Sequence, residues 1–177
     1  MNISRRAVLF NSLIMAGCST TCAFGNDSVK PNTMKSENTS SFFELYPVGR
    51  IERKGKSVSL HIFKKYKDAL KGLDGFSHVF VLYWFDRNDT HEKRSILQVH
   101  PRGNKNNPLT GVFACRAPVR PNLIALSLCK IISVKNNIVY IENIDALNNS
   151  PILDLKPYIP HIDHINKDVR VPDWLKE

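Results

Sequence analysis

The chain has 177 residues, of which 42% are hydrophobic and 23% charged, proportions that are ordinary for a soluble globular protein. That length holds one domain and a tail and excludes two full-sized domains. Lysine and arginine outnumber aspartate and glutamate by 25 to 16, for a formal charge of +9. The excess favours a polyanion partner such as RNA, because each neutralised phosphate releases counterions. A solvated positive face is the alternative interpretation.

Residues 1–25 have the pattern of an export signal. Paired arginines at 5–6 precede apolar runs at 7–10 and 13–17, which are too short to span a bilayer comfortably. Such a pair before an apolar run is typical of a twin-arginine signal. The lipobox-like sequence ending at Cys18 predicts lipidation there, whereas the small residues at 23–25 predict ordinary signal-peptide cleavage. We expect export to the periplasm, and the alternatives are a buried N-terminal helix and a cytoplasmic protein.

The remaining chain divides into three segments by composition. Residues 26–41 are rich in Asn, Ser, Thr, Lys and Pro and nearly lack apolar side chains, so they are predicted to form a disordered linker. Residues 42–163 carry the apolar runs and are expected to form the folded domain. Residues 164–177 form a C-terminal tail, and we expect Trp174 in it to pack back on the domain.

Short strand-like runs dominate the domain. Alternating apolar and polar residues predict a half-buried strand at 58–62, and a helical turn is expected at 66–70. The bulky run 76–85 suits a strand buried on both faces. Further strands are predicted at 96–100 and 111–115, on either side of a Pro/Asn/Gly loop at 101–110.

The second half of the domain continues this pattern. The apolar stretch 123–134, the turn at 136–137 and the run 138–141 predict a hairpin, and a last strand is expected at 152–155. Six or seven strands without a sustained helix predict a mainly β fold, a single small antiparallel β-barrel with short helical turns.

Cysteine and histidine spacing gives no indication of a metal site. Cys115 and Cys129 lie in apolar segments, where a buried thiol behaves as a small hydrophobe. The alternative is that the two cysteines form a disulfide. The six histidines show no ligand-pair spacing, so no metal is predicted.

The densest polar motif is the loop 116–122, which holds Arg116, Arg120 and Asn122 between prolines. The prolines stiffen the loop, so two guanidiniums and an amide there suit phosphate, ribose or base edges. The alternative is a barrel corner whose arginines pair with Asp145 or Asp154.

Two further segments carry polar groups beside apolar ones. The turn 145–151 follows a predicted buried strand and is suited to gripping a nucleoside, and Asp154 and Lys156 share one strand face as an ion pair or a substrate clamp. The segment 84–89 places acidic groups after aromatic ones, a combination that attracts a sulfonium centre, although aromatic residues are more often core.

Four ordered motifs in these segments resemble the TsaA-like/TrmO family. The pattern PxGxI corresponds to residues 47–51, and GLxGFSHxxVLYWF to 72–85. The pattern PRG…GVFATRSPxRPNPIGLS corresponds to 101–103 and 111–127, and DxxDGTPVLDIKPYxP to 145–160. The resemblance covers about 120 residues of the chain.

This resemblance implies a β-barrel, a homodimer, and S-adenosyl-L-methionine bound near the dimer interface. It implies a methyltransferase that acts on N6 of threonylcarbamoyladenosine in tRNA, next to the anticodon. The implied cofactor-binding residues are Asp86, Arg87, Arg102, Asp145, Ala146, Leu147 and Asn148. The implied substrate or catalytic residues are Arg116, Arg120, Asn122, Asp154, Lys156 and Tyr158.

The chain departs from the family pattern at several positions: Cys115, Leu123 and Ala125 stand for Thr, Pro and Gly, and residues 148–150 read Asn-Asn-Ser in place of Asp-Gly-Thr. Because neither tRNA nor the cofactor is expected outside the cytoplasm, the export-like N-terminus defines an alternative function. In that alternative the chain is an exported binding module that keeps the barrel without the tRNA methylation.

Overall fold

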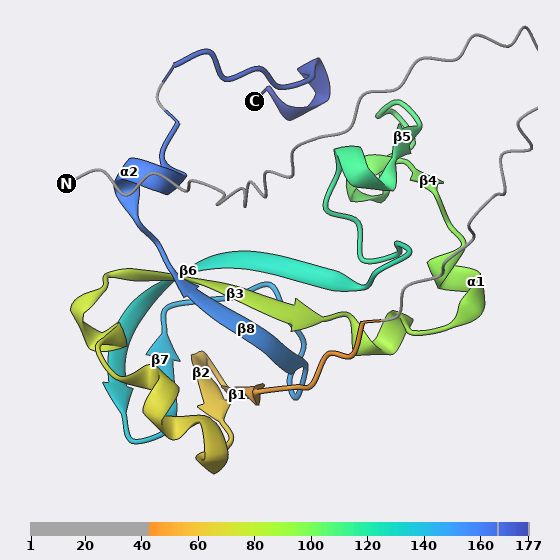
Figure 1. Cartoon of the computed structure of the whole chain (residues 1–177). Helices are drawn as coiled ribbons and strands as arrows, with labels where there is room; N and C mark the ends of the chain where they lie inside the picture. The colour runs from red at the N-terminus through yellow and green to blue at the C-terminus, as the bar shows by residue number, and fades with distance from the viewer. Residues whose placement is uncertain (1–42, 166, 177) are drawn as a thin grey trace, which may run out of the picture. The chain divides into compact units, whose positions relative to one another are not determined.

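The computed structural model describes residues 43–165 and 167–176. The predicted export signal at 1–25, the predicted linker at 26–41 and Cys18 lie outside the described residues. The described chain forms a closed antiparallel β-barrel with short helical turns (Figure 1), which confirms the predicted fold class. Around the barrel the strands follow the order β1-β2-β7-β6-β3-β8.

The barrel strands have the following bounds: β1 Gly49–Lys54, β2 Ser57–Ile62, β3 His78–Trp84, β6 Ile124–Lys135, β7 Ile138–Ile141 and β8 Pro151–Pro157. β1 pairs with β2 and β6 with β7 as hairpins, and β1 meets β8 through Gly49↔Ile152 to close the ring. Asn136 adopts a left-handed φ of 56° in the turn between β6 and β7, as the Asn-Asn pair predicts. Closure removes the exposed edges that an open sheet would have.

The barrel interior is the hydrophobic core. Val79, Val81 and Tyr83 of β3 point inward and are almost fully buried, and they pack with Leu60, Val139, Ile141 and Ile152. The alternate residues of β3, including Phe80 and Leu82, point outward and are only half-buried. The prediction that this strand is buried on both faces is therefore wrong, because a barrel wall buries one face in its core and leaves the other outside.

The connection from β3 to β6, residues 85–123, extends beyond the barrel and is called the arm here. It contains these elements: η3 Asp86–Asn88, α1 His91–Arg94, β4 Gln98–Val99, η4 Pro101–Gly103, β5 Thr110–Gly111 and η5 Val112–Ala114. Only two residues each of β4 and β5 pair, as Gln98↔Gly111 and Val99↔Thr110. The predicted strands at 96–100 and 111–115 are thus too long, because residues 112–114 have no partner strand and form a 3-10 turn.

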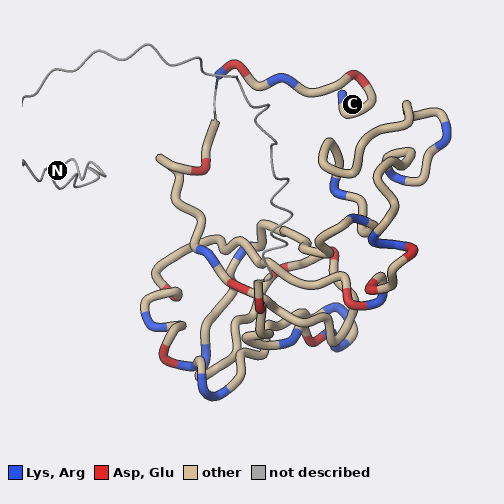
Figure 2. Tube along the Cα trace, turned by 45° about the vertical axis from the view of Figure 1, so that its right-hand side comes forward, with Lys and Arg blue, Asp and Glu red and all other residues tan. Residues whose placement is uncertain are grey.

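The other short helical elements are η1 Lys64–Leu70, η2 Leu73–Gly75, α2 Pro160–Asp163 and η6 Asp173–Leu175. No helix in the described part of the chain is long and apolar enough to cross a membrane. Cys115 and Cys129 are both free thiols, and burial raises the pKa of Cys129 to about 11. Lys and Arg are distributed over the barrel and the arm alike (Figure 2).

Gly49 of β1 lies against the backbone of β2, and its place in the sequence motif has a steric cause. A Cβ on residue 49 would lie 2.4 Å from the His61 carbonyl oxygen of β2. Both atoms in conflict are attached to backbone in the closed ring, so neither can rotate away. We predict that Gly49→Ala lowers the free energy of unfolding by roughly 1 to 3 kcal/mol, measured by urea denaturation.

The matched control is Gly75→Ala, since a Cβ at Gly75 meets nothing within 4 Å. Equal stability of the two variants would contradict the steric explanation for Gly49.

Candidate functional site

Three surface hollows meet at Arg116 and Asp145, where the arm joins the barrel. Both residues line all three hollows. The hollows have volumes of about 990, 500 and 470 Å³. Volumes of this size suit small molecules or single nucleotides. We refer to them as the arm hollow, the turn hollow and the sheet hollow, in that order.

The turn hollow gathers nearly all the residues that the family resemblance assigns to the cofactor. It is lined by η3 on one side and by the turn after β7 on the other. The assigned residues that line it are Asp86, Arg87, Asp145, Ala146, Leu147 and Asn148.

Arg53 of β1 fixes the turn that carries these residues. Its Nε donates to the Ala146 carbonyl at 2.7 Å, and its Nη2 donates to the Ile144 carbonyl. Its backbone N–H donates to Oδ1 of Asn148 at 2.8 Å. The three bonds place the carbonyls inward against β1 and leave the Asp145 side chain at the junction of the hollows.

The Asn-Asn-Ser departure from the family pattern is compatible with this turn. Asn149 has a left-handed φ of 72°, a conformation that favours glycine and that asparagine tolerates better than most residues. Its N–H donates to the Ile51 carbonyl at 2.7 Å, and its own carbonyl accepts from Arg50 at 3.0 Å. The substitution therefore keeps the turn while removing a carboxylate at Asn148.

Tyr83 of β3 supports the same turn from inside the barrel. Its ring is buried, packs edge-on against Phe85 at 5.6 Å, and its hydroxyl donates to the Asp145 carbonyl. Burial raises the pKa of Tyr83, so the phenol stays protonated and keeps donating.

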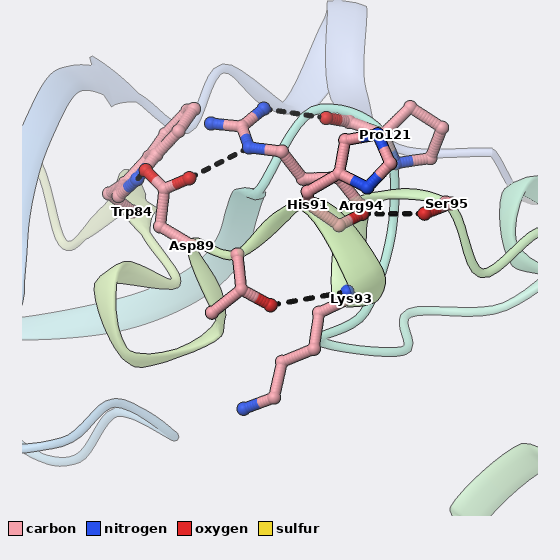
Figure 3. Close-up of polar contacts among 8 residues, drawn as sticks. Trp84, Asp89, His91, Lys93, Arg94, Ser95 and Pro121 are labelled. Atoms are coloured by element: carbon pink, nitrogen blue, oxygen red, sulfur yellow. Dashed lines mark hydrogen bonds and ion pairs between the residues drawn. The ribbon is translucent and has the colours of Figure 1, made fainter.

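A cluster around Arg94 of α1 fixes the arginine loop 116–122 (Figure 3). The Arg94 guanidinium donates to Oδ1 of Asp89 at 2.7 Å and to the Pro121 carbonyl at 2.8 Å, and it lies 5.3 Å from the Trp84 ring centroid. The hydrogen bond from Arg94 holds the pKa of Asp89 below its usual range. One side chain thus links the end of β3, the short helix and the loop.

Within the loop, the predicted residues have different positions. Arg120 lines the sheet hollow and donates to the Val112 carbonyl at 3.0 Å, while Arg116 is exposed at the junction. Asn122 is exposed and lines none of the hollows described above. Neither arginine follows the alternative of pairing with Asp154, because Asp154 binds Lys156 instead, at 2.8 Å.

Arg102 lies outside the turn hollow and shares a hollow with only one other assigned cofactor residue, Asp145. It lines the arm hollow, together with His100, Phe113 and Cys115. Its φ of 59° is left-handed, an uncommon conformation outside glycine that tends to occur at functional sites. Two hydrogen bonds stabilise this loop. His100 Nδ1 bonds the Asn107 carbonyl at 2.8 Å, and the Asn107 side-chain amide donates to the Pro101 carbonyl at 2.9 Å.

Asp154, Lys156 and Tyr158 lie on another part of the barrel. Asp154 and Lys156 both point outward from β8, opposite Leu82 and Phe80 of β3, as their spacing predicts. Tyr158 packs near the rings of His78 and Phe80, at 6.2 and 6.0 Å. None of the three residues lines a hollow that reaches Arg116 or Asp145 in the same chain.

The wall of the turn hollow contains groups that can attract a positively charged centre. Asp86 and Asp145 supply carboxylates, and Tyr83 and Phe85 supply aromatic surface. Two of the three arginines in its wall are committed to backbone carbonyls, since Arg53 holds the turn and Arg87 donates to the Asn148 carbonyl at 3.1 Å, and the third is Arg116. Within residues 43–165 and 167–176, no group of His, Cys, Asp or Glu is arranged to hold a metal ion.

Sequence reasoning missed four residues that shape the site. Arg53, Tyr83 and Arg94 act through hydrogen bonds to backbone carbonyls of distant segments, and no local pattern indicates such bonds. Trp174 was expected to contact the domain, but its place in the wall of the arm hollow was not foreseen.

Comparison with known proteins matches residues 43–164 to the family described as the tRNA-methyltransferase O N-terminal domain. The chain is 44% identical over 121 residues to a probable S-adenosyl-L-methionine-binding protein of Methanocaldococcus jannaschii, covering 68% of this chain and 96% of that one. A tRNA (adenine(37)-N6)-methyltransferase of Mus musculus is 40% identical over 106 residues, covering 60% of this chain and 24% of the mouse protein.

A solved structure gives the same result for the fold. The crystal structure of TrmO from P. aeruginosa superposes with a TM-score of 0.60 at 26% identity, covering 78% of this chain. This chain spans 64% of that TrmO chain, so the two share the barrel domain but differ in extent.

We predict that Arg94→Met raises the pKa of Asp89 toward the ordinary aspartate range, as measured by NMR titration of its carboxyl carbon. A carboxyl whose folded pKa is lowered stabilises the protein above its unfolded pKa of about 4, and this stabilisation is lost as the pH falls through the folded pKa. The acid-induced destabilisation attributable to Asp89 therefore disappears in the variant.

Arg94→Lys is the matched control, because it keeps the charge but cannot span Asp89 and Pro121 with one planar fork. An Asp89 pKa that is unchanged in Arg94→Met would contradict the assigned role of the guanidinium.

Proposed function

The chain belongs to the tRNA-methyltransferase O family through residues 43–164, and from this premise we propose that it is an S-adenosyl-L-methionine-dependent tRNA methyltransferase. The proposed reaction transfers a methyl group to N6 of threonylcarbamoyladenosine, next to the anticodon. Relatives named as S-adenosyl-L-methionine-binding proteins support the cofactor, and the mouse relative's name supports the substrate.

The observation that carries this proposal is the junction of two chemically different hollows at Asp145 and Arg116. The turn hollow offers Asp86 and Asp145 to a cationic cofactor. The arm hollow offers Arg102 and Arg116 to an anionic substrate. A transfer between two ligands requires that their sites adjoin, and these two share one wall.

Bound S-adenosyl-L-methionine supplies an electrophilic methyl group on its sulfonium. The chain's contribution is to hold the nucleophile in line with that methyl and to exclude other geometries. We assign Asp86 to the sulfonium charge, Arg116 and Arg120 to the substrate, and the Asp145 carboxylate to the proton released from N6. Tyr83 and Arg53 position Asp145 through its own and neighbouring carbonyls.

The cofactor assignment predicts a charge-selective effect of Asp86→Asn. The variant loses affinity for S-adenosyl-L-methionine by about 5- to 10-fold, because a carboxylate near the sulfonium contributes roughly 1 kcal/mol at a partly exposed site. The affinity of the variant for S-adenosylhomocysteine, which lacks the positive charge of the sulfonium, stays nearly unchanged. Isothermal titration of the full chain with both ligands measures the difference.

Asp74→Asn, at an exposed turn that lines none of the three hollows, is the control. Absence of any binding to the unsubstituted chain at millimolar cofactor would refute the methyltransferase itself.

The substrate assignment predicts that Arg120→Ala reduces methyl transfer by about 10- to 100-fold, the loss expected for one charge-assisted contact. Transfer is measured by mass spectrometry of nucleosides from tRNA that carries threonylcarbamoyladenosine. Circular dichroism checks the fold, since the 3.0 Å bond to the Val112 carbonyl is also lost. Full turnover in a folded variant would remove Arg120 from the site.

We further propose that the chain acts as a homodimer. Phe80 and Leu82 of β3 and Leu126, Leu128 and Ile132 of β6 make an outward apolar face on adjacent strands, and the three on β6 are 43%, 48% and 65% exposed. Contiguous apolar surface of this kind is typical of association sites. Asp154 and Lys156 border this face, so a pairing through it supports a role for them at the site of a second copy.

Leu128→Asp is predicted to shift the protein from dimer to monomer in light scattering, because the charge would be buried in the interface without a partner. Leu109→Asp is the control, since Leu109 is 58% exposed but lies in the arm, away from this face. A monomeric unsubstituted chain, or a dimeric Leu128→Asp variant, would contradict the proposed interface.

A second candidate is an exported S-adenosyl-L-methionine-binding module without tRNA methylation. It is favoured by the signal-like pattern of residues 1–25, by the missing carboxylate at Asn148, and by the binding-protein names of the archaeal relatives. The same titration and transfer assays separate it, because it predicts cofactor binding with no methyl transfer. For location, a chain recovered from the cytosol with Met1 still present, by mass, would refute export and lipidation of Cys18.

A further inference from the structure

The C-terminal tail contributes a wall to the arm hollow. Trp174 and Leu175, on η6, line this hollow together with Arg102, Phe113 and Arg116. In Figures 1 and 2 the C-terminal turn lies beside the arm. The tail follows the family-matched residues 43–164, so this wall comes from a segment outside the matched domain.

We propose that Trp174 is a stacking platform for an unpaired RNA base in the arm hollow. The inference rests on the proposed tRNA substrate and names a residue and a contact that would hold it. Unpaired bases are commonly bound on aromatic side chains beside arginines that hold the backbone, and this combination tolerates different bases.

The local structure of the tail presents the indole in a defined way. The turn closes through Leu175 N–H to the Pro172 carbonyl at 3.0 Å, and Lys176 Nζ pairs with Asp173 Oδ1 at 2.6 Å. Pro172 fixes the backbone just before the turn. Trp174 itself is only partly buried, so part of its ring surface stays available to a ligand.

The charges of the arm hollow favour a nucleotide of RNA over the cofactor. Among the described residues that line it, Arg102 and Arg116 carry positive charge and Asp145 carries negative charge, and Arg116 and Asp145 are shared with the turn hollow. Guanidiniums attract phosphate and repel a sulfonium. The arm hollow, at about 990 Å³, is also about twice as large as the turn hollow at about 500 Å³, which leaves room for a base with its sugar and phosphate.

The indole can be observed directly, because the chain has only two tryptophans. In a full-length Trp84→Phe background Trp174 is the sole tryptophan. Titration with a single-stranded oligoadenylate of about seven nucleotides, a length within the range of such grooves, should quench its fluorescence. No quenching at oligonucleotide concentrations that saturate binding would overturn the proposal.

Substitution at Trp174 measures the contribution of stacking. Trp174→Ala should weaken oligoadenylate binding by about tenfold and raise the KM for tRNA by a similar factor with little change in kcat, whereas Trp174→Phe should retain most of the affinity. Tyr46→Ala is the matched control, since Tyr46 is an aromatic residue 65% exposed that lines none of the hollows described above. Equal RNA affinity of Trp174→Ala and the unsubstituted chain would overturn the proposal.

Titrating the same variants with S-adenosyl-L-methionine shows whether the indole stacks on an RNA base or on the adenine of the cofactor. If Trp174→Ala weakens S-adenosyl-L-methionine binding and leaves oligoadenylate binding unchanged, the indole stacks on the cofactor's adenine and the RNA assignment is overturned. If the Trp174→Ala variant binds RNA as tightly as the unsubstituted chain, and the unsubstituted chain methylates tRNA, the inference about Trp174 fails and the proposed function stands. If the unsubstituted chain neither binds RNA nor transfers a methyl group, both fail.

Discussion

The grip of Arg53 on the turn after β7 is the interaction on which the candidate site depends. Two carbonyls and one side-chain amide of this turn accept from a single residue of β1. Together with the bond from the Tyr83 hydroxyl, these bonds give hydrogen-bond donors to three backbone carbonyls that would otherwise lack a partner in the described part of the chain. Because these bonds hold the turn to the barrel, the Asp145 side chain lies where the three hollows meet.

The arm depends on a second, weaker set of constraints. It has little regular structure, and β4 and β5 pair over only two residues each. Its two ends are held together instead by Arg94, which bonds Asp89 and the Pro121 carbonyl, 27 residues further along the chain than Arg94, and lies over the Trp84 ring at the end of β3. Loops that carry functional groups are commonly braced in this way on a rigid scaffold. The barrel supplies the scaffold here, and the arm supplies most of the charged groups.

The distribution of charge gives each hollow a different preference. Arg53 and Arg87 line the turn hollow but are bound to carbonyls, which leaves Arg116 as the arginine that the turn hollow shares with the other two hollows. Arg102 and Arg116 face the arm hollow. The turn hollow thus has two carboxylates, Asp86 and Asp145, in its wall, and the arm hollow has Asp145 alone among the described residues that line it. The outward face of β3 and β6 adds an apolar surface with Asp154 and Lys156 at its border.

The sequence by itself determined the barrel. Alternation in residues 58–62, the apolar run 138–141 and the Asn-Asn turn before it predict paired strands, because side-chain period and turn chemistry are local properties. It also located Asp86, Arg87, Arg116 and Asp145 by motif. It overestimated β5 and the burial of β3, because whether a strand has a partner or a covered outer face depends on segments far away in the chain.

Only the tertiary structure decided how these residues are grouped. It gathers Asp86 and residues 145–148 in one hollow and places Arg102 in another. It also leaves Asp154, Lys156 and Tyr158 on a separate face, and brings Trp174 to the arm. The contacts that do so are side-chain bonds to backbone carbonyls and the packing of a tail, and both depend on how a closed barrel superposes distant segments in space. Residue spacing along the chain carries no information about such contacts, which is why the fold follows from the sequence and the site's geometry does not.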